Sequence, residues 1–359
     1  MMKRQDQSLV ATAEPGAGQV PAMAAYFDRL ATVEMRNRGM PAGKIGPLYE
    51  AALAEGGGLP LVYRAAAGLM EAVHRNDNVL IVTGAGSGPL IPKGENDGPV
   101  GAAILARAIH MGLHAVPILV CEEHHLDPVV SSAEAVGVGI RALEVALESK
   151  VGGAVVTAPT TQAAVDDWAD ELLERTRPSA VIAIERLGPN RLGIVHGATG
   201  LSGWDPLVDL APLFSAAAQR RIFSIGIGDA GNEIGFGRIA EAVRQIQPHG
   251  ARCQCDCGGG MATVTPTDVL VVAAVSNWGA YGIEACLSIL LERPDLPHSP
   301  KEAERVILRC LEAGGLEAMN CTQRFFVDGI AGEVSVSMVQ MLGEMVRIYC
   351  EPPDRGAIH

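Results

Sequence analysis

The first residues that could do chemistry lie in the acidic segment 95–101, which begins with Glu95 and Asp97. Pro99 suits the first position of a helix, and Asp97 or Gly98 can cap that helix. A helix start therefore accounts for Asp97, but it does not account for Glu95, which lies beyond the reach of a cap. Carboxylates beside a helix N-terminus are held ionised, so this pair could bind a cation or accept a proton.

A second candidate is the segment 226–237, which contains five glycines. So many glycines let the backbone approach a small ligand closely. Asp229, Asn232 and Glu233 add oxygen atoms that suit a hard cation or an ammonium group. The segment formally matches G-x-G-x-x-G, but Asp229 would repel a pyrophosphate, so we do not expect a dinucleotide. A glycine-rich turn before a capped helix is the alternative.

Other polar residues follow further predicted strands. Arg186 could clamp a substrate carboxylate through two hydrogen bonds, although an internal ion pair of Glu185 with Arg186 explains the dipeptide equally well. Ser276 and Asn277 could orient a carboxylate or an amide, and Trp278 could wall the pocket or pack in the core. The candidate substrate-binding residues are Thr83, Gly98, Glu185, Arg186, Asn232, Ser276, Asn277 and Trp278.

The elements that must position these residues alternate between short apolar runs and longer amphipathic stretches. The runs are 79–83, 115–121, 154–157, 180–184, 222–227 and 269–275, and the stretches are 99–111, 128–149, 162–175, 206–219, 234–247 and 280–291. Fully apolar runs are typical of strands that are buried on both faces of a parallel sheet. The pattern predicts an α/β fold with a doubly wound, mostly parallel sheet and helices on both faces. The carboxyl ends of its strands should form the ligand crevice.

Three regions divide the chain. Residues 1–20 lack periodicity and are expected to form a loose tail, and residues 21–75 show helical spacing and are expected to form a helical lead-in. The α/β domain is expected over residues 76–350.

Composition limits the class of function. The chain has 359 residues, a net charge of −13 and 4% aromatic residues, and this acidity argues against a nucleic-acid partner. No apolar run is long enough for a membrane span, and no secretory signal follows the first residues. We expect a cytoplasmic protein with reduced thiols. No P-loop occurs, so no nucleotide cofactor is expected. The sequence does not determine the oligomeric state, and a homo-oligomer is a possible partner arrangement because symmetric dimers are common.

Three of the eight cysteines recur at every second position. Cys253, Cys255 and Cys257 would share one face of a strand and could hold zinc, with His249 as a further ligand. The spacing is not that of a C-x₂-C pair, so reduced structural cysteines are the default interpretation.

The motifs together resemble the D-glutamate cyclase family, in the C-terminal domain of its members. The resemblance covers roughly residues 75–345 and rests on the segments 95–99, 183–186, 226–237, 255–256 with 276–279, and, more weakly, 328–332. Ala230 and Phe236 stand where the family usually has Gly and Met.

The resemblance implies a lyase that cyclises glutamate, with D-glutamate favoured, to 5-oxoproline with loss of water. Our hypothesis assigns the acidic catalytic roles of this reaction to Glu95, Asp97, Asp229 and Glu233. Of these, Asp97, Asp229 and Glu233 would hold a divalent cation, Mg²⁺ or Mn²⁺. Two alternatives stay open: a hydro-lyase or isomerase acting on another small amino or hydroxy acid, and a sensor that binds a carboxylate without converting it.

Overall fold

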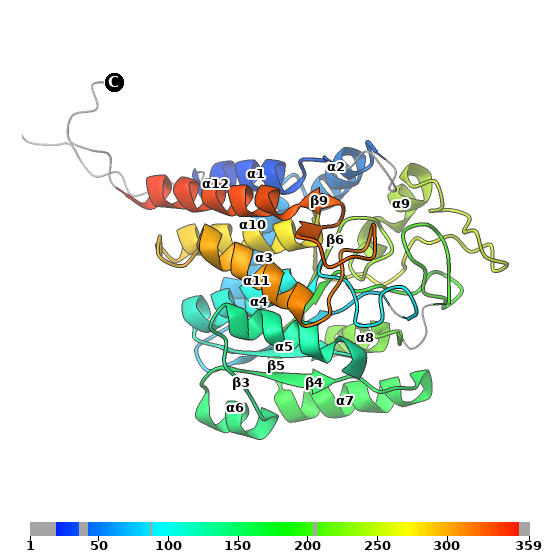
Figure 1. The fold of residues 1–359 in the computed structure, drawn as a ribbon, viewed down its shortest axis with the longest axis horizontal. Helices are drawn as coiled ribbons and strands as arrows, with labels where there is room; N and C mark the ends of the chain where they lie inside the picture. Colours follow the sequence, from blue (N-terminus) through cyan, green and yellow to red (C-terminus); the bar gives the residue numbers. More distant parts are fainter. Residues whose placement is uncertain (1–18, 36–41, 87, 204–206, 352–359) are drawn as a thin grey trace, which may run out of the picture.

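The computed structural model describes residues 19–35, 42–86, 88–203 and 207–351, and a parallel sheet lies at its centre (Figure 1). Within these residues the sheet has seven strands in the order β3-β4-β2-β1-β5-β6-β7. Every neighbouring pair is parallel. The strands are β1 (Asn78–Thr83), β2 (Val116–Cys121), β3 (Ile140–Arg141), β4 (Gly153–Thr157), β5 (Pro178–Ile184), β6 (Phe223–Gly228) and β7 (Val269–Val272).

The strand order places a topological switch point between β1 and β5. The chain leaves β1 toward β2 on one side of the sheet, whereas it leaves β5 toward β6 on the other side. Loops that diverge in this way leave a crevice outside the carboxyl ends of the two strands. The segments that follow β1, β5 and β6 therefore meet at one place.

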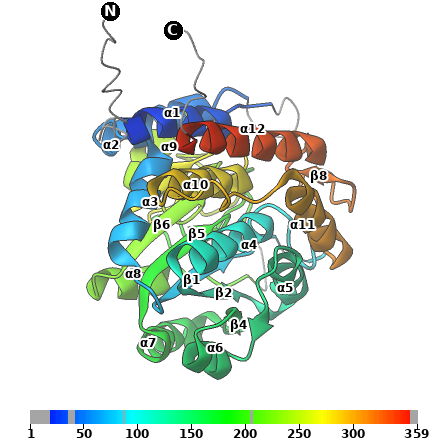
Figure 2. The ribbon, with the colours of Figure 1, turned by 90° about the vertical axis from the view of Figure 1, so that its left-hand side faces the viewer.

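Helices cover both faces of the sheet, in two layers that Figures 1 and 2 show on opposite sides. One layer consists of α3 (Leu61–Ala72), α4 (Pro99–Ala108), α5 (Leu126–Ala135), α10 (Ser276–Leu290) and α11 (Pro300–Glu312), and α1 (Gln19–Ala31) and α12 (Gly332–Cys350) pack on its outer side, against α10 (Figure 1). The other consists of α6 (Leu143–Ser149), α7 (Val165–Thr176) and α8 (Ala211–Gln219). Near β7, α2 (Ile45–Glu55) packs against α9 (Ala240–Ile246), and β8 (Phe326–Val327) pairs with β9 (Ile330–Ala331) in a short hairpin.

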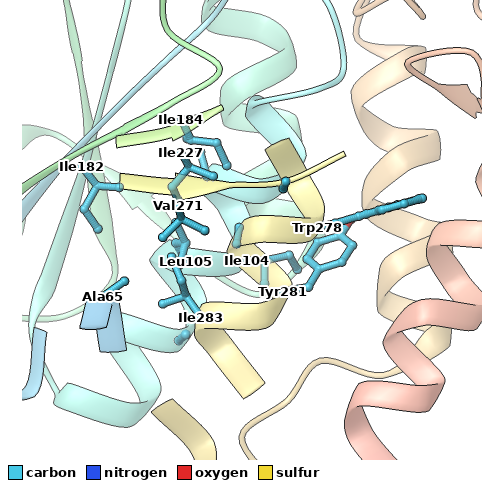
Figure 3. Packing of buried hydrophobic residues seen from close by; sticks show 14 of the residues in the cluster. Ala65, Ile104, Leu105, Ile182, Ile184, Ile227, Val271, Trp278, Tyr281 and Ile283 are labelled. Carbon is cyan, nitrogen blue, oxygen red and sulfur yellow. The ribbon is translucent and has the colours of Figure 1, made fainter. Parts of the chain in front are cut away.

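The central strand β1 shows why both faces are apolar. Val79 and Ile81 belong to the core beneath α4 and α10, whereas Leu80 and Val82 belong to the core beneath α7 and α8. Successive residues of a strand point to opposite faces, so a strand covered on both sides must be apolar throughout. Figure 3 shows the first core, where side chains of α4 and α10 pack over the strands.

The fold class predicted from the sequence is confirmed, and its main differences from the prediction lie in two elements. The single helix expected over 128–149 is two helices, α5 and α6, with the short edge strand β3 between them. Gly137 in the connection has a φ of 85°, a conformation that ends a helix and that suits glycine.

The last strand and the helix after it also have other bounds. The strand expected over 269–275 ends at Val272, and the helix expected over 280–291 begins earlier, at Ser276. Ser276, Asn277 and Trp278 therefore form the first turn of α10 rather than a loop. Of the tail expected over 1–20, residues 1–18 lie outside the described residues, and Gln19 and Val20 begin α1.

Candidate active site

A pocket of about 150 Å³ opens at the switch point of the sheet. Sites for drug-sized ligands have volumes of about 300–1,000 Å³, so this one suits a smaller molecule. Its lining comes from the segments after β1, β5 and β6, together with the loop 197–199 and the hairpin β8–β9. The lining residues are Ala85, Gly86, Ile91, Glu95, Glu185, Leu187, Gly197, Ala198, Thr199, Asp229, Ala230, Asn232, Ala318, Met319 and Asp328.

The titratable residues of this lining are all acidic. They are Glu95, Glu185, Asp229 and Asp328, from four separate segments of the chain. Carboxylates that converge in a buried site raise one another's energy when they are ionised. The pocket is therefore suited to a positively charged group, such as a metal ion or an ammonium group.

Asp97 lies beside this lining, in the turn that starts α4. Its Oδ2 accepts a hydrogen bond from the backbone N–H of Ser276 at 2.9 Å, and its Oδ1 accepts one from that of Asn277 at 2.8 Å. Asp97 thus caps α10, which explains why that helix starts earlier than its apolar pattern suggests. The side chain of Asn277 in turn binds the start of α4, because its Oδ1 accepts hydrogen bonds from the backbone N–H groups of Gly98 and Gly101 at 3.0 and 2.6 Å.

Gly98 is required where the two helices and β5 meet. It has a φ of 97°, and a Cβ there would lie 2.7 Å from Thr83 Oγ1 and 2.9 Å from Glu185 Cβ. A side chain at this position would push Asp97 away from the strand ends. Gly98 and Thr83 therefore shape the site from behind, and neither lines the pocket.

Glu185 occupies the end of β5 in a strained conformation, with a φ of 45°. Its Oε2 accepts a hydrogen bond from Ser276 Oγ at 2.5 Å. Burial, followed by the nearby carboxylates of Asp229, Glu233 and Asp97, raises the pKa of Glu185 well above its usual value. Backbone strain of this kind persists where the surrounding contacts hold a residue for a task.

Glu233 turns back on its own loop rather than toward the pocket. Its carboxylate accepts the backbone N–H groups of Asp229 and Ala230 at 2.9 Å and of Gly231 at 2.7 Å. Burial and the charge of Asp229 raise its pKa to about 7. The carboxylate of Glu233 holds the loop closed, and this places Asp229 at the pocket.

Three carboxyl groups come close enough to share one ion. Asp97, Glu185 and Asp229 each offer an oxygen, and these oxygens lie within 4.8 Å of one another. All three residues are buried. This set differs from the predicted one, because Glu185 takes the place of Glu233, whose oxygens are engaged by its own loop. Oxygen ligands at such spacing suit a hard divalent cation.

Asn232 supplies a neutral acceptor beside these acids. Its Nδ2 donates to the carbonyl oxygen of His196 at 2.8 Å. Its Oδ1 is buried and has no hydrogen-bond partner among the described residues. A buried amide oxygen without a partner costs free energy, so this atom is a candidate for contact with a ligand that donates a hydrogen bond.

Arg186 points to the opposite side of β5 and does not line the pocket. Its two terminal nitrogens each lie 2.6 Å from an oxygen of Glu122, and they also donate to the carbonyl oxygens of Gly84 and Val208. Burial alone would raise the pKa of Glu122, but the charge of Arg186 and hydrogen bonds from Arg186 and His125 hold it well below its usual range. The guanidinium therefore makes an internal ion pair, with Glu122 rather than Glu185 as its partner.

Trp278 packs in the core, the alternative considered for it. Its side chain is fully buried, and its Nε1 donates to Ser335 Oγ at 2.9 Å. Ser276 and Asn277 contact Glu185 and Asp97 rather than the pocket itself. The predicted residues thus include four that line the pocket, Glu95, Glu185, Asp229 and Asn232. Asp97, Glu233, Ser276, Asn277, Gly98 and Thr83 lie behind them, whereas Arg186 and Trp278 belong to the ion pair with Glu122 and to the core.

Sequence reasoning missed part of the lining. Asp328 lies in the turn of the β8–β9 hairpin, and the loop 197–199 and residues 318–319 complete the wall. Only Asp328 had a signal, because it begins the weak fifth match to the family. The other positions are small or apolar, and their types indicate no chemistry.

The thiols of Cys253, Cys255 and Cys257 do gather, but His249 is not the imidazole beside them. His249 Nε2 lies 3.3 Å from Gln254 Nε2, whereas His196 Nε2 lies 3.3 Å from Cys255 Sγ. His196 is distant in sequence from the cysteines, so spacing along the chain could not identify it.

Comparison with known proteins agrees with the motifs. Residues 61–343 match the model of a family described as "D-glutamate cyclase-like, C-terminal". The chain is also 32% identical over 200 residues to a human protein named "D-glutamate cyclase, mitochondrial". That match covers 55% of this chain and 30% of the human protein.

A membrane-spanning helix requires both length and a predominantly apolar sequence. None of the helices in the described residues combines the two.

Proposed function

We propose, because this chain belongs to the D-glutamate cyclase-like family, that its pocket binds glutamate and cyclises it to 5-oxoproline with release of water. The observation that supports this reaction is the lining itself, in which acidic residues converge with a buried amide acceptor. A substrate with an amine and two carboxyl groups is small enough for this volume. The acidic residues and the Asn232 amide oxygen would accept hydrogen bonds from the amine, and a bound cation would contact a carboxyl group of the substrate.

The amine of the substrate has to lose protons before it can attack. We propose that Asn232 Oδ1 accepts a hydrogen bond from the ammonium group and that Glu95, which also lines the pocket, takes up its proton. The amine nitrogen then forms a bond to the γ-carboxyl carbon, and one C–O bond of that group breaks. In total, two protons leave the ammonium group and two protons join the departing oxygen, which leaves as water. Glu95 would therefore pass protons from the nitrogen to that oxygen and end in its starting state.

Asp97, Glu185 and Asp229 are proposed to hold a divalent cation, Mg²⁺ or Mn²⁺. Their donor set fits such an ion, because three buried carboxyl groups present oxygens to one point. When bound, the ion would polarise the γ-carboxyl group of the substrate. Ser276, through its hydrogen bond to Glu185, and the α10 N–H groups, through Asp97, keep these carboxyl groups in position.

A direct assay tests the proposal. The purified chain is incubated with D-glutamate or L-glutamate, with Mg²⁺ or Mn²⁺ present, and 5-oxoproline is measured by chiral chromatography. We expect product from D-glutamate. Saturable binding without product would favour the sensor, and turnover of another amino or hydroxy acid alone would favour the hydro-lyase or isomerase.

Removal of the ion tests the cation separately. Dialysis against EDTA should abolish turnover, and added Mg²⁺ or Mn²⁺ should restore it. Activity that survives complete removal of divalent ions would exclude the cation from the mechanism.

A further inference from the structure

A second cluster of metal-ligand types lies outside the acidic site. His196, Cys253, Cys255 and Cys257 each offer a ligand atom, and all four atoms lie within 4.8 Å of one another. Cys253 Sγ is 3.4 Å from Cys255 Sγ and 3.2 Å from Cys257 Sγ, and His196 Nε2 is 3.5 Å from Cys257 Sγ. All of these cysteines are free thiols.

The spacing is close to that of a tetrahedral site. Zinc lies about 2.3 Å from thiolate sulfur and about 2.0–2.1 Å from imidazole nitrogen, which separates its ligand atoms by about 3.5–3.8 Å. The four distances in the cluster fall within about half an ångström of that range. A disulfide would require a sulfur separation of about 2.05 Å, far shorter than any here.

The surrounding hydrogen bonds prepare the ligands for a metal. His196 Nδ1 lies 2.9 Å from the carbonyl oxygen of Ile194, which can only accept, so Nδ1 carries the proton and Nε2 presents its lone pair to the thiols. The N–H of Gly259 donates to Cys257 Sγ at 3.4 Å. Such a donor stabilises a thiolate, which is the form that binds zinc.

We propose that His196, Cys253, Cys255 and Cys257 bind one Zn²⁺ in a closed, structural site. Four protein ligands leave no position for a substrate, as in structural rather than catalytic zinc sites. Thiolate ligands select zinc over Mg²⁺ or Mn²⁺, so this site and the acidic site take different ions.

The zinc ion would join a loop that lines the pocket to a second loop that lies outside the lining. His196 belongs to the loop that continues into the lining residues 197–199, and the cysteines belong to the segment 253–257. The loops already touch, since Gln254 Nε2 donates to the carbonyl oxygen of Thr199 at 2.7 Å. The backbone carbonyl oxygen of His196 accepts a hydrogen bond from the side chain of Asn232, which lines the pocket. His196 would therefore bind the ion through its ring and position Asn232 through its backbone.

Metal content tests the proposal without any substrate. The full chain is purified under reducing conditions without a chelator, and zinc is measured by plasma mass spectrometry. Native mass spectrometry, which does not depend on any variant, should show one Zn²⁺ bound with loss of the thiol protons. We expect one equivalent per chain, and Co²⁺ in its place should give the thiolate charge-transfer absorption of a tetrahedral site.

Matched variants locate the ion. Cys255→Ser and His196→Asn should lose the zinc, whereas Cys321→Ser, at another partly buried free thiol, and His249→Asn should retain it. Absence of zinc in the wild-type chain together with no uptake of added Zn²⁺ would overturn the proposal, as would a disulfide within the cluster. Zinc bound to a chain that forms no 5-oxoproline would support this site and count only against the proposed reaction.

Discussion

Glu185 and Arg186 are consecutive residues at the end of β5, yet they belong to opposite electrostatic environments. Arg186 is fully buried and pairs with Glu122 through two contacts of 2.6 Å. Glu185 is buried beside the carboxylates of Asp229, Glu233 and Asp97, and burial together with these charges raises its pKa. The charges of Arg186 and Glu122 cancel within the fold, whereas the carboxyl groups around Glu185 favour the uptake of positive charge. The comparison separates an ion pair that supports structure from a cluster that is suited to a ligand.

The largest expected effect comes from the acidic cluster. Asp229→Asn and Glu185→Gln should each lower turnover by about 10²–10⁴-fold, because they remove an ion ligand and charge at the reacting group. Both variants should stay folded by circular dichroism. Glu123→Gln, at an exposed acid on the same edge of the sheet, is the control and should keep its activity. Full activity in Asp229→Asn would remove this residue from the mechanism.

Breaking the ion pair should instead affect stability. Glu122→Gln leaves the Arg186 guanidinium buried without its charged partner, so the free energy of unfolding in urea should fall by about 3–5 kcal/mol. The double variant Glu122→Gln with Arg186→Met should recover part of this loss, since no charge is then left unpaired. A Glu122→Gln chain as stable as the wild type would show that the pair contributes nothing.

The stability that the Glu122–Arg186 ion pair contributes should depend on pH. Folding lowers the pKa of Glu122 from its ordinary value of 4.5, so the unfolded chain takes up the proton first as the pH falls. The stability that Glu122 contributes is complete above pH 4.5 and is lost progressively below it. The difference in unfolding free energy between wild type and Glu122→Gln should therefore shrink below pH 4.5, measured by urea titration at several pH values. A constant difference would contradict the lowered pKa.

The smallest effect should come from a supporting residue of the cluster. Ser276→Ala removes the hydrogen bond to Glu185, which is ionised when it holds the proposed cation; a bond to a charged group is worth about 1.5–3 kcal/mol. We expect kcat/KM to fall by about ten- to a hundredfold, with the fold unchanged. Ser288→Ala, at a buried serine of the same helix whose hydroxyl donates to the carbonyl oxygen of Glu284, is the matched control. An equal loss in both variants would show that the effect is structural.

Much of the fold was predictable because its signal is local. Apolar runs such as 180–184 show strands that are buried on both faces, and the repeated units then predict the parallel sheet. The element bounds were less predictable, since α10 begins at Ser276 through a cap from Asp97, a residue that is distant in sequence. A short edge strand such as β3 has too few residues to produce a pattern.

The site was predictable as a set of acids but not as an arrangement. Glu95 was identified from its place before a predicted helix, and Glu185 and Asp229 from their places after predicted strands; all three line the pocket. Which side of β5 Arg186 would face depended on Glu122, from another strand end. His196 beside the cysteines and Asp328 in the hairpin depended on long-range contacts, which a single sequence does not display.

Because Glu185 and Arg186 point in opposite directions, the number of residues between β5 and this pair has to be kept. An insertion of one residue directly after β5 would move Arg186 toward the acidic pocket and Glu185 toward Glu122. Both environments would then fail at once, because each would receive the residue that the other requires. Length variation in descendants of this chain, or in engineered versions of it, should therefore avoid the two residues at this strand end and accumulate in the exposed turns farther along the loop.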